Sequence, residues 1–134
     1  MYSRIIVALG LEHGHGERAM DVARQLLSDG GEIVALHVIE PVPGVVSYYL
    51  PEGHEKEVKE KALEQVKQRI GDAADAKAKV LFGHPGRLIP EYAKEIGADC
   101  IVVGSHKAEV GDYLLGATAA RIVRHAACPV HVIR

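Results

Sequence analysis

The stretch that decides the fold is Cys100-Ile101-Val102-Val103-Gly104-Ser105-His106-Lys107. Its first half is apolar and β-branched, as in a buried strand, and its second half passes into glycine and small polar residues. Leu114-Leu115-Gly116-Ala117-Thr118 follow shortly afterwards, where a helical pattern begins. Glycine lets a ligand approach the main chain, and a helix start offers unpaired N–H groups at the positive end of the helix dipole. The segment therefore predicts a cradle for an anion such as phosphate.

Outward from this segment, strand-like and helix-like patterns alternate along the chain. Short apolar runs predict strands at residues 5–9, 33–39, 78–82, 101–103 and 130–133. Apolar residues spaced three and four apart predict helices within residues 19–27, 58–70, 88–96 and 115–126. Gly30-Gly31, Gly71 and Gly97 stand where the first three helices are expected to stop.

This alternation predicts an α/β fold, a single domain over residues 1–134 with a doubly wound five-stranded parallel sheet and helices on both faces. We expect the strand order 3-2-1-4-5 with right-handed crossovers. Ligands of such folds bind beyond the carboxyl ends of the strands, where the strand order reverses. That place lies between the strand that ends near Leu9 and the strand that ends near Val103, so Gly10, Val38 and the glycine-rich segment should meet there.

The composition favours a soluble globular protein. Hydrophobic residues make up 48% of the 134-residue chain and charged residues 25%, which is enough apolar material for a core. Because the formal net charge is -2 and the basic residues do not cluster in the sequence, we expect no nucleic-acid partner. No apolar stretch is long enough to span a membrane and no signal-peptide pattern opens the chain, so we expect a cytoplasmic protein without a membrane partner.

Several segments resemble the universal stress protein family, and the resemblance covers the whole chain. They are Ile5-Ile6-Val7-Ala8-Leu9, Leu36-His37-Val38-Ile39, Gly104-Ser105-His106, Leu114-Leu115-Gly116 and the ending from Val123 to Arg134. In the nucleotide-binding branch of the family, Gly-x-x-Gly, a spacer and then Gly-Ser or Gly-Thr hold the triphosphate of ATP. Here Gly104 matches the first glycine, Lys107 replaces the second, the spacer is one residue shorter, and Gly116-Ala117 follow. This form is similar to the small filament-associated subfamily, whose members are also credited with binding ATP or related nucleotides.

The resemblance implies a stress-response protein that binds an adenine nucleotide as a regulatory ligand: ATP, or ADP or AMP, with Mg²⁺ as an optional companion. The residues that it assigns to the nucleotide site are Leu9, Gly10, Val38, Gly104, Ser105, His106, Lys107, Gly116, Ala117 and Thr118. Gly10 departs from the family, which usually has an aspartate there that reaches the nucleotide near the ribose. Ala117 lacks the hydroxyl that would meet a phosphate oxygen, and Thr118 and Lys107 are candidates to replace part of that contact.

These departures leave a second hypothesis open, a nucleotide-free protein of the same fold that acts through dimerisation and partner contacts. In that case the glycines would serve only to form a tight strand-to-helix crossover, and Val38 would be only a core residue of its strand. The last strand, residues 130–133, would be a sheet edge, and antiparallel pairing with a second copy would cover it. The resemblance implies the same homodimer, while the protein partner stays unknown. A flavin or electron-transfer module of similar architecture rests on fold analogy alone.

The other chemistry-bearing residues point to no catalytic or metal site. No nucleophile elbow or catalytic triad can be read from the sequence, so we expect at most slow ATP hydrolysis. Cys100 and Cys128 lie in or beside apolar runs without Cys-x-x-Cys spacing, which favours buried reduced thiols over a redox role. His13 and His15 lack a third ligand nearby, so no metal is expected. His37 alternates with apolar residues, and we expect its ring to find a partner in the core or at an interface.

Overall fold

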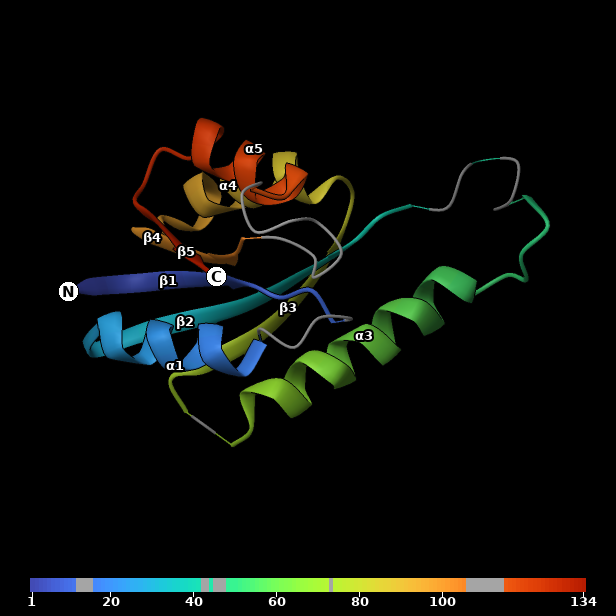
Figure 1. The fold of residues 1–134 in the computed structure, drawn as a ribbon. Coiled ribbons are helices and arrows are strands. Elements are labelled where there is room, and N and C mark those ends of the chain that lie inside the picture. The colour runs from blue at the N-terminus through green and yellow to red at the C-terminus, as the bar shows by residue number, and fades with distance from the viewer. Residues whose placement is uncertain (12–15, 42–43, 45–47, 73, 106–114) are drawn as a thin grey trace.

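The computed structural model describes residues 1–11, 16–41, 44, 48–72, 74–105 and 115–134. Its five-stranded parallel sheet has the order β3-β2-β1-β4-β5, which confirms the predicted fold class and strand order (Figure 1). The strands are β1 (Tyr2–Ala8), β2 (Leu27–Ile39), β3 (Ala76–Phe82), β4 (Cys100–Gly104) and β5 (Val130–Ile133). The helices are α1 (Gly16–Leu26), α3 (His54–Ile70), α4 (Pro85–Ile96) and α5 (Ala117–His125). None of the helices in the described ranges is long and apolar enough to cross a membrane.

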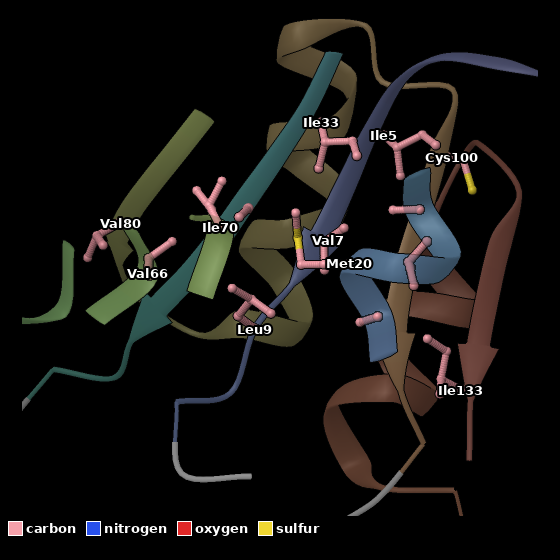
Figure 2. Close-up of a cluster of buried hydrophobic side chains, with 14 of the residues drawn as sticks. Ile5, Val7, Leu9, Met20, Ile33, Val66, Ile70, Val80, Cys100 and Ile133 are labelled. Atoms are coloured by element: carbon pink, nitrogen blue, oxygen red, sulfur yellow. The ribbon is translucent and has the colours of Figure 1, made fainter. Parts of the chain in front are cut away.

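The sheet separates two hydrophobic cores. Helices α1 and α3 cover one face, and α4 and α5 cover the other (Figure 1). Because side chains alternate along a strand, β1 sends Ile5 and Val7 to the first face and Ile6 to the second. Figure 2 shows the first core, in which Met20 of α1 and Val66 of α3 belong to the same cluster as the β1 side chains. The central strand is therefore buried on both faces, and only its ends are available to a ligand.

Two of the predicted helix stops are confirmed. Gly71 ends α3 with φ of 71°, and its N–H donates to the Lys67 carbonyl. Gly97 ends α4 in the left-handed conformation with φ of 70°, and the next N–H, that of Ala98, donates back to the Ala93 carbonyl at 2.8 Å. Both glycines occupy a backbone conformation that other residues adopt at a cost.

The third predicted stop, at Gly30-Gly31, is wrong. Helix α1 ends at Leu26 and β2 begins at Leu27, which already pairs with Tyr2 of β1 before the register shifts. A Cβ at Gly31 would lie 2.6 Å from Leu27 Cδ1 and 2.9 Å from the Ser3 carbonyl oxygen. The glycine pair therefore lets an irregular strand fold closely over its own start and over β1, instead of ending a helix.

Polar residues link neighbouring strands at their amino ends. Glu32 of β2 lies 2.8 Å from Lys77 Nζ and 3.6 Å from Arg4 Nε, so it links three adjacent strands. Asp99 accepts the N–H groups of Ser3 at 2.9 Å and Arg4 at 3.0 Å. These contacts fasten β1 to the turn before β4 and leave the opposite, carboxyl edge of the sheet for a site.

The two cysteines are free thiols on different sides of the sheet. Cys100 belongs to the core under α1 and α3, whereas Cys128 packs against the core under α4 and α5. Burial raises the pKa of the Cys100 thiol to about 11. Cys100 is therefore a protonated core residue at neutral pH, as the sequence pattern predicts, and Cys128 is half-buried.

Candidate functional site

A cavity of about 540 Å³ opens at the carboxyl ends of β1, β2 and β4, where the strand order reverses. Eight of the residues that the sequence assigned to the site line it: Leu9, Gly10, Val38, Gly104, Ser105, Gly116, Ala117 and Thr118. The other two, His106 and Lys107, lie outside the described residues, as do His13 and His15. The predicted segments thus converge on one hollow from four different parts of the chain.

The main chain of Val38 faces this cavity, although its side chain belongs to the core. The carbonyl of Leu36 accepts the Leu9 N–H at 2.9 Å on the β1 side, and the carbonyl of Ile39 accepts the Gly83 N–H at 2.9 Å on the β3 side. Main-chain groups alternate sides along a strand, so the N–H and C=O of Val38 point to the β1 side. The paired register of β1 has already ended, at Ala8 opposite Leu36. Val38 therefore offers a donor and an acceptor, side by side, to the cavity.

His37 fixes the end of β1, a role that the sequence did not reveal. Its Nδ1 lies 2.7 Å from the Leu9 carbonyl oxygen. Because a carbonyl only accepts hydrogen bonds, Nδ1 carries the proton, and in the neutral ring Nε2 is an acceptor. The ring thus has the partner expected of a histidine in a strand, and it also lines the cavity. The alternation of His37 with apolar residues was the only signal for it.

The first turn of α5 presents N–H groups to the cavity. Gly116 stands at the N-cap position with φ of -58° and ψ of 154°, and no side chain caps the helix. The first hydrogen bond that closes the helix runs from the Ala120 N–H to the Gly116 carbonyl at 2.8 Å. The N–H groups of Ala117, Thr118 and Ala119 lie between these residues, and a helix cannot pair them itself. They combine with the helix dipole to favour an anion at this end of the cavity.

Ser105 joins the end of β4 both to β5 and to the residue before α5. It is buried, and its N–H donates to the Ile133 carbonyl at 2.7 Å, which joins the end of β4 to β5. Its carbonyl accepts the Gly116 N–H at 2.6 Å. The N–H groups of Ser105 and Gly116 are therefore used inside the protein, and the donors for an anion come from the helix turn that begins at Ala117.

The cavity walls are mainly apolar, and Glu40 is the one formally charged residue among its described lining residues. Glu40 is exposed and follows the last residue of β2. Sequence reasoning missed it, because a glutamate after a strand is common on any surface. An apolar wall with a few main-chain donors and acceptors suits a flat, partly apolar ring carrying an anionic tail.

The universal stress protein family model matches residues 1–134. Universal stress protein G of Shigella flexneri is 32% identical over 145 aligned residues, with all of both chains covered. The solved structure of the protein MJ0577 has a TM-score of 0.75 and is 26% identical, covering 99% of this chain and 96% of that one.

Two solved structures that share the fold contain nucleotides. One is a universal stress protein from Archaeoglobus fulgidus in complex with dAMP, 21% identical with a TM-score of 0.60, covering 99% of this chain and 98% of that one. The other is a universal stress protein in complex with cAMP, 21% identical with a TM-score of 0.63, covering 99% of this chain and 97% of that one.

Proposed function

The chain belongs to the universal stress protein family, and from this premise we propose that it binds an adenine nucleotide, in the first place ATP, as a regulatory ligand. The observation that carries the proposal is the cavity that joins the free main-chain edge of Val38 to the first turn of α5. Its volume of about 540 Å³ lies within the usual range for small-molecule sites. The dAMP and cAMP complexes of related folds support the choice of an adenine nucleotide.

In the proposed pose, the adenine pairs its polar edge with the N–H and C=O of Val38. Leu9 and Gly10 line the base and ribose, and the phosphates lie over the first turn of α5. Gly104 lets the phosphate chain pass close to the end of β4. His106 and Lys107, outside the described residues, would add contacts from the segment that joins β4 to α5.

Two substitutions relative to the family pattern weaken this site. Gly10 removes a carboxylate near the ribose, and Ala117 removes a hydroxyl near the phosphates. A hydrogen bond to a charged group contributes about 1.5–3 kcal/mol, so the loss of the carboxylate lowers affinity roughly ten- to a hundredfold. The loss of the hydroxyl, at an exposed position where water competes, lowers it roughly fivefold. Mg²⁺, when bound, would neutralise phosphate charge. We propose a cytoplasmic binding protein with at most slow ATP hydrolysis.

The alternative is a nucleotide-free protein that works through dimerisation and partner contacts. The observation in its favour is that β5 lies at the edge of the sheet, with β4 as its one neighbour in the sheet order. His131 is exposed on this strand, and an apolar edge is covered when the strand pairs antiparallel with a second copy. We propose the homodimer under both hypotheses, since pairing along β5 leaves the cavity at the carboxyl ends of β1, β2 and β4 open.

The deciding experiment is calorimetry with ATP, ADP and AMP on the wild type and on Ala117→Pro. Proline fits the first position of a helix, so this change removes one phosphate donor and keeps the helix. We expect binding to the wild type and about tenfold weaker ATP binding to the variant. Absence of heat with every nucleotide at millimolar concentration would favour the nucleotide-free alternative, and equal binding by both proteins would place the phosphates elsewhere.

A further inference from the structure

A second hollow, of about 350 Å³, lies between α4 and α5, and among the described residues it shares no lining residue with the first. Its lining residues in the described part of the chain all belong to these two helices. On α4, Gly86, Pro90 and Lys94 follow one another at four-residue steps, so they share one stripe of the helix. On α5, Arg121 and His125 are also four residues apart and form the facing stripe. We call this hollow the α4–α5 groove.

At Gly86, which has no side chain, Arg121 of α5 comes close to the α4 backbone. A Cβ at Gly86 would lie 2.9 Å from both Cβ and Cδ of Arg121, so glycine lets this arginine lie directly across α4. Pro90 has no N–H, so the Gly86 carbonyl lacks its usual i+4 hydrogen-bond partner in the helix. The groove thus combines an arginine held against the α4 backbone with a main-chain carbonyl that lacks its usual helical partner.

The charge of the α4–α5 groove is positive, although the chain as a whole has a formal net charge of -2. Arg87, Lys94 and Arg121 are permanent cations, His125 adds charge when protonated, and Glu91 is the one carboxylate among the lining residues. The ion pairs formed within the described ranges join Glu32 to Arg4 and Lys77, and Asp21 to Arg24. The cations of the groove therefore have no carboxylate within ion-pair distance in the described part of the chain.

We propose that the α4–α5 groove binds an acidic segment of a partner protein. Arg87 and Arg121 present planar forks that match carboxylates bidentately. All four basic side chains are exposed, so water weakens each contact, and a single small anion would gain little from any one of them. A chain segment that carries several carboxylates engages them together and follows the groove between the two helices.

The test is fluorescence anisotropy with a labelled octa-glutamate peptide, with and without ATP. We compare the wild type with Lys94→Glu and Arg121→Glu in the groove and with Lys61→Glu, an exposed position on α3 that makes the same charge change elsewhere. We expect each groove variant to bind about tenfold more weakly and the α3 control to bind like the wild type. Binding should also weaken as salt rises. Circular dichroism checks that each variant is folded. If Arg121→Glu does not fold, Lys94→Glu, which changes an exposed side chain, still tests the groove.

Three results would overturn the proposal. The first is a wild type that does not bind the peptide at millimolar concentration. The second is an equal loss in the groove variants and in Lys61→Glu, which would mean a response to net charge alone. The third is tighter binding of a labelled single-stranded oligonucleotide or of inorganic tripolyphosphate at the same residues. Because the groove and the nucleotide cavity share no lining residue, failure here leaves the proposed function standing, and the reverse also holds.

Discussion

Ala117→Ser tests the proposed phosphate end of the cavity by adding a hydroxyl that this chain lacks there. Ala117 is the first residue of α5, lines the cavity and is exposed. A serine there keeps the main-chain N–H and adds a hydroxyl donor at the place where the proposed phosphates lie. Serine is tolerated at a helix start, so the fold should not change.

The size of the gain follows from the exposure of the site. A hydrogen bond to a charged group contributes about 1.5–3 kcal/mol, but water competes at an exposed position, so we take about 1 kcal/mol. This value corresponds to roughly fivefold tighter binding of ATP. Adenosine has no phosphate, so its affinity should not change.

Calorimetry with ATP and adenosine measures both quantities. Ala120→Ser is the matched control, because the Ala120 N–H already donates to the Gly116 carbonyl and its position lies beyond the first turn. An affinity for ATP that stays the same in Ala117→Ser would refute the placement of phosphates on α5. An equal gain with adenosine or in Ala120→Ser would show that the effect is unrelated to the phosphates.

Four further predictions concern stability and reactivity. Ile101→Ala removes a fully buried side chain from the second core and should cost about 2–5 kcal/mol in urea unfolding. Gly31→Ala should lower stability by about 1–3 kcal/mol because its Cβ meets a backbone oxygen, whereas Gly44→Ala, where a Cβ meets no atom of the described residues within 4 Å, should not. Burial acts to raise the pKa of Asp99, but hydrogen bonds from the backbone N–H groups of Ser3, Arg4 and Asp99, together with the N-terminal charge, outweigh it and lower the pKa. The stabilising contribution of Asp99 is therefore present above the ordinary pKa of an aspartate and is lost as pH falls through the lowered value, so Asp99→Asn should flatten this acid limb of the stability profile. The pKa of Cys100, raised to about 11, leaves little thiolate at neutral pH, so native protein should react with Ellman's reagent at this residue only after unfolding.

The strand order and the place of the cavity follow from the sequence, because apolar periodicity and glycine positions are local signals. The Gly30-Gly31 pair shows where such signals fail. The same dipeptide ends a helix or permits a close strand contact, and the choice depends on Leu27 packing over Gly31. That contact is tertiary and cannot be read from neighbours in the chain.

Main-chain chemistry at the site is even less visible in the sequence. Val38 is a core residue by its side chain, and its free N–H and C=O arise only because β1 ends before β2 does. Ser105 and Gly116 were assigned to the nucleotide site, yet the Ser105 N–H donates to the Ile133 carbonyl and the Gly116 N–H to the Ser105 carbonyl. Which backbone groups stay unpaired depends on the lengths of adjacent strands, and these are settled only when the sheet assembles.

The pairing of β1 with β4 has a consequence for synthesis on the ribosome. Ile5 pairs with Cys100, so the β4-facing edge of β1 has no partner strand while most of the chain is still to be synthesised. At roughly 5–20 residues per second, this takes several seconds or more, during which an apolar strand edge is open to chaperones and to other nascent chains. The wall that β4 contributes to the cavity is also absent until then, so a small ligand cannot assist the early steps of folding and can stabilise only the nearly finished protein.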